Sequence, residues 1–282
     1  MTRIDAHHHL WDLARREQAW LDGPKLASIH RTFTVADFAA VAAAAGIERS
    51  VLVQVLPDAD ETREFLALAA DSRLVAGVVG WTDLTAPDVA EALAALREGP
   101  GGDRLVGIRH LVQGEADPRW LCRADVSRAL TAIGEAGLCY DLLTYPHQLP
   151  AAIETVRALP QLTFVLDHLS KPPIASGALE PWATALRELA GEPNVFCKLS
   201  GMVTEANQGS WTVSDLRPYA DIALDAFGPD RLMFGSDWPV CLLAASYDDV
   251  AGAARELTAQ LSEDERAQVF GGAAARAYRL EF

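Results

Sequence analysis

The chain alternates between short apolar or β-branched segments and longer Ala/Leu-rich segments, and this alternation restricts its possible folds more than any other feature. Eight short segments have the composition of buried strands, at residues 4–9, 50–55, 74–81, 105–111, 138–143, 163–168, 194–199 and 231–237. Eight longer segments have helical spacing, at residues 35–45, 59–71, 86–98, 125–136, 147–159, 180–190, 215–226 and 247–261. Strands that alternate with helices in this way form parallel βαβ units.

Capping residues mark where several of these helices begin and end. A glycine in the left-handed conformation commonly follows a helix, and three of the predicted helices are followed by Gly46, Gly137 and Gly228. Side chains that cap the first turn are expected at Thr34, Asp125 and Ser214. The predicted boundaries therefore rest on capping chemistry as well as on periodicity.

Eight strand–helix pairs are the number that closes a (β/α)8, or TIM, barrel, and a further helix is predicted near residues 263–277. An open doubly wound sheet is the alternative, and it would usually carry a Gly-rich phosphate-binding turn after its first strand. That position holds His7, His8 and His9, and the sequence contains neither GxGxxG after a strand nor GxxxxGKS/T. We therefore predict one α/β barrel domain over residues 1–282.

Composition sets the broad class of the molecule. Half of the 282 residues are hydrophobic, which is enough for a substantial core, and the formal net charge is -15. That acidity disfavours nucleic acid and anionic membranes as partners, because both attract basic surfaces. No apolar run reaches ~18 residues, so no membrane span is predicted. Met1 leads into the first strand without an apolar signal region, so we expect a cytoplasmic protein, with a homodimer left open as its assembly.

Polar and aromatic side chains gather at or near the carboxyl ends of the predicted strands. Active sites of parallel barrels lie at this end, on the loops that follow the strands. The residues concerned are His7, His8, His9, Trp81, Arg109, His110, Tyr145, His147, His168, Lys171, Lys198, Asp237 and Trp238. Five of the seven histidines end a strand and His147 follows one, so we expect the active site there.

Strand geometry divides the run of three histidines. Side chains alternate along a strand, so His7 and His9 share one face while His8 points to the other. An i, i+2 pair can direct two imidazoles at one point, as a metal site or an electrophilic clamp requires. His168 and Asp237, at the ends of two other strands, extend the pair to three imidazoles and a carboxylate.

Structural explanations stay open for three of these residues. His168 could be a core histidine bonded to a backbone carbonyl, and Asp237 could cap the segment after it, although Gly235 would leave room beneath its carboxylate. A structural ion pair explains Lys198, which lies within a strand, as well as a ligand contact does. Serine-hydrolase and glycosidase chemistry are disfavoured, because the sequence has no GxSxG elbow and no strand-end carboxylate pair.

Three strand-end motifs occur together in this chain. They are Asp5-x-His7-x-His9-x-Trp11 on the first strand, "LDHLSKP" after the sixth and "MFGSDWPV" after the eighth. With "GIRHLVQ" and "KLSGM", they resemble the amidohydrolase superfamily and, more narrowly, its amidohydrolase 2 branch of sugar-acid lactonases and pyrone-dicarboxylate lactonase. The resemblance covers essentially the whole chain. It implies a TIM barrel that hydrolyses a small cyclic ester such as L-fucono- or L-rhamnonolactone.

The resemblance also implies roles for the strand-end residues. Asp237 would be the general base that deprotonates water, and His7, His9 and His168 would stabilise the oxyanion formed at the lactone carbonyl. The same four residues could hold one divalent metal, with zinc as the first choice, or act without a metal.

Two positions depart from the superfamily pattern. Strand four presents Arg109 or His110 in place of a bridging lysine or glutamate, and strand five contains no histidine, so a binuclear metal centre is not implied. Substrate contacts are expected from Trp11, Trp81, Arg109, His110, Tyr145, His147, Lys171, Lys198 and Trp238. Arg109 is the one arginine at a strand end, which favours a neutral sugar lactone over a dicarboxylate. The loop at residues 11–33, which carries Trp11 and Trp20, is placed to cover the barrel mouth.

Two other functions stay open at the level of sequence. A metal-dependent non-oxidative decarboxylase of the same superfamily would share the barrel, the histidine pair, a later histidine and the strand-eight aspartate. A non-catalytic barrel would bind lactones without opening them.

Overall fold

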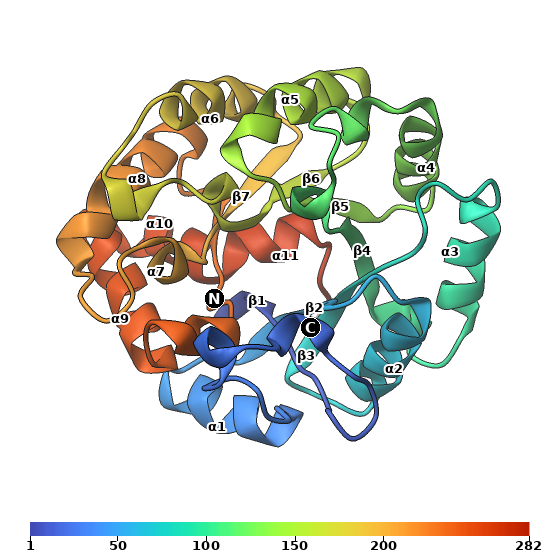
Figure 1. The fold of residues 1–282 in the computed structure, drawn as a ribbon, viewed down its shortest axis with the longest axis horizontal. Coiled ribbons are helices and arrows are strands. Elements are labelled where there is room, and N and C mark those ends of the chain that lie inside the picture. Colours follow the sequence, from blue (N-terminus) through green and yellow to red (C-terminus); the bar gives the residue numbers. More distant parts are fainter. Residues whose placement is uncertain (282) are drawn as a thin grey trace.

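Eight parallel strands follow one another around a barrel in the order of the sequence (Figure 1). The computed structural model describes residues 1–281, so residue 282 of the predicted domain lies outside the described residues. The strands are β1 Ile4–His8, β2 Arg49–Val53, β3 Val75–Gly80, β4 Leu105–His110, β5 Cys139–Leu142, β6 Phe164–Leu166, β7 Val195–Leu199 and β8 Leu232–Phe234. β8 returns to β1, where the amide of Asp237 donates to the carbonyl of His7 at 2.8 Å. The predicted (β/α)8 barrel is confirmed.

Helices surround the strands (Figure 1). The α-helices are α1 Val35–Ala44, α2 Ala59–Ala70, α3 Val89–Glu98, α4 Ala124–Glu135, α5 Leu149–Ala158, α6 Trp182–Ala190, α7 Met202–Glu205, α8 Val213–Phe227, α9 Tyr247–Leu257, α10 Glu263–Ala267 and α11 Ala273–Ala277. Short 3₁₀ segments lie at Ala19–Leu21, Pro24–Leu26, Gly102–Arg104, Val112–Gly114, Trp120–Cys122, Pro146–Gln148, Asp167–Ser170, Ile174–Ser176 and Val240–Leu243. Within residues 1–281, no helix combines the length and the apolar character needed to cross a membrane.

The carboxyl-terminal ends of α1, α4 and α8 are each followed by the glycine that the sequence indicates. The φ angles are 75° and 73° at Gly46 and Gly137. Gly228 has a φ angle of 69° but a ψ angle of 168°, so its conformation is not the left-handed helical one that was expected. At the start of α1, the hydroxyl of Thr34 accepts from the amide of Asp37 at 3.3 Å, and the Asp37 carboxylate accepts from the Thr34 amide at 2.8 Å. This reciprocal pair is a capping box.

Two predicted N-caps are wrong by two residues. α4 begins after Arg123 rather than after Asp125, whose carboxylate pairs with the Arg123 guanidinium at 2.6 Å. α8 begins after Thr212 rather than after Ser214, because Thr212 forms a capping box with Asp215. The helices therefore start slightly earlier than their apolar pattern alone indicates.

The C-terminal segment closes the amino-terminal end of the barrel. The helix predicted at 263–277 is divided into α10, a π-helical turn η10 at Gln268–Gly272, and α11. Gly271 allows close approach to the first residues, because a Cβ there would lie 2.1 Å from the carbonyl oxygen of Thr2. α11 and Tyr278 form a buried cluster with inward-facing strand residues Ile4, Ala6, Val51, Val53, Val79, Cys139, Val165 and Met233. The barrel interior is therefore a packed core.

β6 and β8 are among the strands that end earlier than predicted, and in these two the difference orients a site residue. β6 ends at Leu166 and β8 at Phe234, whereas the predicted segments continue to His168 and Asp237. The φ angle is 53° at His168 and 57° at Asp237, a left-handed conformation that non-glycine residues rarely adopt. Such residues leave the path of the strand, so tight turns direct these two side chains instead of strand alternation.

Asp5 connects the first and last strands below the site. One of its carboxylate oxygens accepts from the amides of His7 at 3.1 Å and Ser236 at 2.9 Å, and the other accepts from the hydroxyl of Tyr247 on α9 at 2.9 Å. Asp5 is fully buried, so these bonds replace its contacts with water. They hold the end of β1, which carries His7, against the segment that leads to Asp237.

Candidate active site

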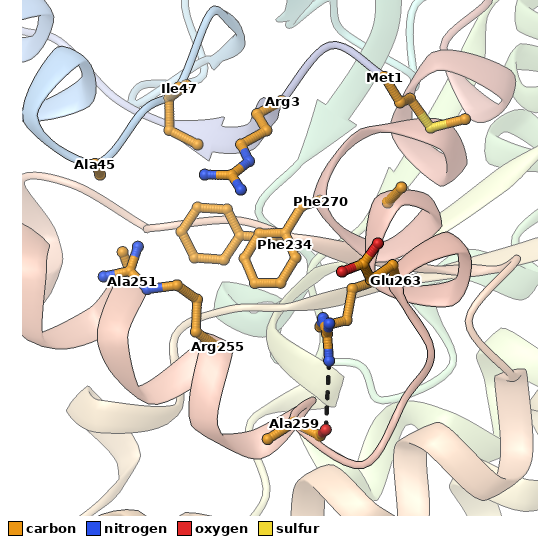
Figure 2. A pocket seen from close by; sticks show the side chains of 12 residues that line it. Met1, Arg3, Ala45, Ile47, Phe234, Ala251, Arg255, Ala259, Glu263 and Phe270 are labelled. Atoms are coloured by element: carbon orange, nitrogen blue, oxygen red, sulfur yellow. Dashed lines mark hydrogen bonds between the residues drawn. The ribbon is translucent and has the colours of Figure 1, made fainter.

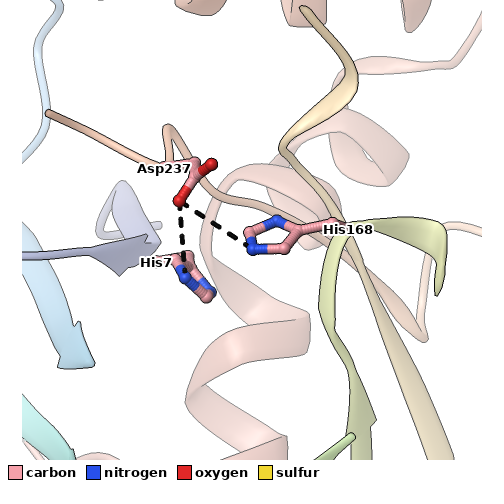
Figure 3. A group of neighbouring side chains, drawn as sticks. All are labelled: His7, His168 and Asp237. Atoms are coloured by element: carbon pink, nitrogen blue, oxygen red, sulfur yellow. Dashed lines mark ion pairs between the residues drawn. The ribbon is translucent and has the colours of Figure 1, made fainter. Parts of the chain in front are cut away.

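Three imidazoles and one carboxylate converge where β1, β6 and β8 end, and Figure 3 shows His7, His168 and Asp237 among them. Oδ1 of Asp237 lies 3.4 Å from Nε2 of His9, 3.7 Å from Nε2 of His7 and 3.8 Å from Nε2 of His168. The Nε2 atoms of His7 and His9 are 3.0 Å apart. All four residues are buried. Side chains from three separated parts of the sequence thus meet at one point.

His8 takes no part in this convergence. Its ring stacks on Phe38 of α1 with a centroid distance of 3.8 Å, and its Nε2 lies 3.0 Å from Oγ of Ser50. The side chain therefore faces the helices, as strand alternation predicts.

Two glycines make room for the imidazoles. A Cβ at Gly235 would lie 2.7 Å from Cβ of His7, and a Cβ at Gly201 would lie 2.6 Å from the ring of His168. Gly201 also has a φ angle of 63°. The space at Gly235 is therefore filled by His7, where the sequence predicted room beneath the carboxylate of Asp237.

Hydrogen bonds assign the protons of His7 and His9. Nδ1 of His9 lies 2.8 Å from the carbonyl oxygen of Val53, which can only accept, so this nitrogen donates. In a neutral His9 ring Nε2 is then an acceptor, and Nε2–H of His7 donates to it. In this assignment the 3.4 Å contact of Nη1 of Arg109 with Nε2 of His7 is not a hydrogen bond. Nδ1 of His7 must in turn accept, and Nζ of Lys198 lies 3.0 Å away as its donor. Lys198, His7, His9 and Val53 thus form one hydrogen-bonded series, in which the tautomers are assigned from these contacts.

A buried charge cluster of Arg109, Asp141, Asp167 and Lys198 lies beneath the imidazoles. Nζ of Lys198 is 2.6 Å from Oδ2 of Asp141 and 2.8 Å from Oδ1 of Asp167. Nη1 of Arg109 is 2.9 Å from Oδ2 of Asp167. Two cations therefore face two carboxylates, which is the pairing that buried charges require. The structural ion pair that the sequence left open for Lys198 is present.

Burial decides the protonation of the site near neutral pH. Burial and the charge of Lys198 hold the pKa of His7 well below its ordinary value, and burial lowers the pKa of His168 to about 4. Burial alone would raise the pKa of Asp237, but the neighbouring imidazoles, His168 first, lower it below its ordinary value. The site therefore presents an ionised carboxylate beside neutral rings of His7 and His168.

A cavity of about 510 Å³ opens beside Asp237. It is lined by the predicted residues His9, Trp11, Arg109, His168, Lys171 and Asp237, together with Trp20, Val55, Leu56, Pro57, Leu111, Gln113, Leu143 and Val240. The volume suits a small organic molecule, and the walls are mostly apolar with a few polar groups.

The 11–33 loop contributes both of its tryptophans to this lining. The amide of Phe33 donates to the carbonyl of Trp11 at 2.9 Å, and the amide of Trp11 donates back at 3.3 Å. These bonds fasten the two ends of the loop together beside the barrel mouth.

Three of the predicted site residues lie outside the cavity in buried positions. His7 lies beneath His9 and has no exposed surface, and Lys198 lies in the charge cluster. Trp238 packs against Phe33 and Phe38, with centroid distances of 5.1 and 5.5 Å. The left-handed turn before Trp238 directs its ring into the core, a change of direction that a strand-end prediction does not include.

Four further predicted substrate contacts surround the barrel mouth without lining the cavity. Nε1 of Trp81 donates to Nδ1 of His110 at 3.1 Å. Tyr145 and His147 are exposed and stacked, with ring centroids 6.1 Å apart, and Nζ of Lys171 lies 5.4 Å from the centre of the Tyr145 ring. Substrate binding by these four residues stays a prediction.

Besides Asp141, three residues of the site were given no role by the sequence analysis. Asp167 belongs to the charge cluster, Oε1 of Gln54 accepts from Nη2 of Arg109 at 3.0 Å, and Gln113 lines the cavity. Each lies at or just beyond a predicted strand end, so position was a usable signal. Glutamine and aspartate are common in loops, however, and their position alone did not distinguish them.

The converging residues also fit one divalent metal. Imidazole nitrogens and a carboxylate oxygen are common zinc ligands, and the ligand atoms around a tetrahedral zinc lie ~3.4 Å apart. Four of the six separations among these ligand atoms, 3.0, 3.4, 3.7 and 3.8 Å, are close to that value, and the ligand atoms of His7, His168 and Asp237 all lie within 4.8 Å of one another. Coordination by Nε2 of His7 would require its proton to move to Nδ1, where Oδ1 of Asp167, 3.3 Å away, can accept it.

A parallel barrel with a carboxylate and imidazoles at the carboxyl ends of its strands is the arrangement that barrel enzymes use to activate water. The chain belongs to the amidohydrolase family, whose sequence model, described as Amidohydrolase, matches residues 4–280. The protein is therefore an enzyme, and a hydrolase.

Relatives are similar over nearly the full length of the chain. The L-fucono-1,5-lactonase of Burkholderia ambifaria is 40% identical over 283 residues, and that of Burkholderia multivorans is 43% identical over 289 residues. Each comparison covers 99% of this chain and 96% of the relative. A crystal structure of an amidohydrolase from Burkholderia multivorans with bound zinc is 42% identical, with a TM-score of 0.93 and complete coverage of both chains.

Replacement of Lys198 by methionine should lower the free energy of unfolding by about 3–5 kcal/mol, because the buried Asp141 and Asp167 would lose their shared cation. Urea unfolding followed by tryptophan fluorescence measures this change. Removal of one carboxylate as well, in Lys198→Met/Asp141→Leu, should recover part of the loss.

Lys171→Met is the matched control for this substitution. Lys171 is partly exposed and lies 3.8 Å from Glu205, so its loss should cost about 0–1 kcal/mol. A Lys198→Met protein that is as stable as Lys171→Met would contradict the importance of the buried cluster.

Proposed function

We propose that the enzyme opens a small sugar lactone, such as L-fucono-1,5-lactone, to its hydroxy acid. The observation that carries this proposal is the ionised carboxylate of Asp237, 3.4 to 3.8 Å from three imidazole nitrogens at the edge of a cavity of about 510 Å³. The two relatives named L-fucono-1,5-lactonase support the substrate class. Such a reaction belongs to carbohydrate catabolism.

Lactone opening requires a nucleophilic water, a base, and hydrogen-bond donors near the carbonyl oxygen. Asp237 takes a proton from the water while the water oxygen attacks the carbonyl carbon of the lactone. The ring C–O bond then breaks, and the proton passes from Asp237 to the leaving alkoxide. His168, which lines the cavity, donates to the oxyanion during the attack.

The hydrogen-bonded series gives His9 and His7 different roles from those expected from the sequence. Nε2 of His9 is an acceptor in the neutral series, so it suits an O–H of the attacking water better than the carbonyl oxygen. His7 does not reach the cavity, and it positions His9 and Asp237 through its contacts with both.

The surroundings of Arg109 favour an uncharged substrate. Its guanidinium donates to Asp167 at 2.9 Å and to Oε1 of Gln54 at 3.0 Å, so most of its binding capacity is already used. Lys171 is the other cationic side chain that lines the cavity, and the rest of the lining is mainly apolar. A neutral deoxysugar lactone fits this lining better than a dicarboxylate does.

Asp237→Asn should reduce kcat/KM for L-fucono-1,5-lactone by about 10²- to 10⁴-fold, because an amide cannot accept the proton of the water. A pH indicator measures the acid released on ring opening. Asp225→Asn, which changes an exposed carboxylate on α8, serves as the control and should open the lactone at the wild-type rate. Near wild-type turnover by Asp237→Asn would show that the base is another group.

We also propose that His7, His9, His168 and Asp237 can hold one zinc ion. Stabilisation of negative charge on the carbonyl oxygen is the chemistry that such an ion supplies when bound. His168→Gln should weaken zinc binding in calorimetry by at least about tenfold, because one imidazole ligand is lost. His8→Gln, which changes a histidine that faces α1, should leave zinc affinity unchanged. Equal zinc affinity in both variants would contradict this ligand set.

A lactone panel assayed with and without a chelator separates the alternatives. Lactone opening that persists with the chelator excludes a metal-dependent decarboxylase, which would also release carbon dioxide. Binding of lactones without acid release would identify a non-catalytic barrel.

A further inference from the structure

A second cavity, of about 480 Å³, lies at the amino-terminal end of the barrel (Figure 2). It is enclosed by the segment before β1, the turn before β2, α9, α10 and η10. Arg3 in its wall precedes β1, whereas His9 follows it, and six residues of extended chain span ~20 Å. This cavity is therefore separate from the active site.

The floor of the cavity is aromatic and its walls are small. The rings of Phe234 and Phe270 have centroids 5.3 Å apart and planes inclined by 32°. Around them lie Ala45, Ile47, Ala251, Ala259 and Ala267. Short side chains leave the space above the two rings open, and the volume falls within the ~300–1,000 Å³ of small-molecule sites.

Three arginines stand around this apolar floor. The side chain of Arg3 has neither an ion pair nor a hydrogen bond within residues 1–281, and Figure 2 shows its guanidinium directed toward the two phenyl rings. Nη2 of Arg255 lies 3.6 Å from an exposed carboxylate, that of Asp248. Nη1 of Arg266 donates to the backbone carbonyl of Leu261 at 2.8 Å. Among residues 1–281, no buried carboxylate neutralises any of the three guanidinium groups.

The charge of the lining is opposite to that of the chain. Glu263 is the single acidic residue among the lining side chains, in a protein whose formal net charge is -15. Guanidinium groups bind carboxylates through paired hydrogen bonds, and phenyl rings pack against flat apolar groups. The lining offers few partners for hydroxyl groups, so the sugar acid formed at the active site is a poor fit.

We propose that this cavity binds a small organic anion with a flat apolar body, of the class of aromatic carboxylates. The carboxylate pairs with Arg3 and Arg255, and the apolar body lies against Phe234 and Phe270. This site is independent of the proposed lactone chemistry, so either proposal can fail while the other holds.

Calorimetric titration of the full chain with 1-naphthoate tests the proposal. Arg3→Gln/Arg255→Gln should weaken binding by at least about tenfold, because two charge-assisted contacts are lost. Arg63→Gln/Arg128→Gln, which changes two exposed arginines on α2 and α4, should bind as the wild type does. The uncharged analogue 1-naphthamide should bind at least about tenfold more weakly than 1-naphthoate. Lactone opening should be unaffected by Arg3→Gln/Arg255→Gln.

Four results would overturn the proposal. They are no binding of naphthoate at millimolar concentration, equal affinity in the two double variants, equal affinity for the amide, and competitive inhibition of lactone opening by naphthoate. The last result would place the anion in the active site.

Discussion

The active site depends on a lysine that has no contact with solvent. Lys198 lies between the carboxylates of Asp141 and Asp167, and the third group that it reaches is Nδ1 of His7. Removing a charged amine from water is costly, and two carboxylates at 2.6 and 2.8 Å offset that cost. The lysine thereby makes Nδ1 of His7 an acceptor, so Nε2 of His7 carries the proton. The hydrogen bond between Nε2 of His7 and Nε2 of His9 then makes Nε2 of His9 an acceptor.

The same cluster joins the two ends of the barrel. The hydroxyl of Tyr278, which follows α11, donates to Oδ2 of Asp141 at 2.8 Å. Burial raises the pKa of Asp141 to about 6, and Lys198 opposes this rise. The segment that closes the amino-terminal end therefore also completes the hydrogen bonds beneath the imidazoles. The carboxyl ends of the strands are not covered by this segment, and active sites usually lie at these ends in this fold.

Local periodicity made most of the fold and part of the site predictable. The eight strands and the opposite faces of His7 and His8 follow from alternation along a strand. The inward side of His7 does not follow from that of Ile4 and Ala6, because the pairing of β1 with β2 is irregular between Asp5 and His8. The orientations of His168 and Asp237 could not be predicted in this way, because both residues adopt a left-handed backbone conformation. Non-glycine residues rarely adopt it, and no pattern in the sequence marks where they do. Trp238 was misplaced for the same reason, since it follows one of those turns.

Pairings between strands were beyond the reach of the sequence. Lys198 meets Asp141 across 57 residues, and Arg109 meets Asp167 across 58. Each charge alone reads as a substrate contact or as a surface group. Only the order of β4, β5, β6 and β7 around the barrel shows that the four charges satisfy one another.

The role of Asp237 as a base toward water is tested most directly by a single turnover in ¹⁸O-labelled water with enzyme in excess over L-fucono-1,5-lactone. Direct attack of water on the carbonyl predicts one ¹⁸O in the carboxylate of the product and none in the side chain of Asp237, both measured by mass spectrometry. An unlabelled product with ¹⁸O in Asp237 would instead show that the carboxylate attacks the lactone itself. Label in the newly formed hydroxyl group would contradict attack at the carbonyl altogether.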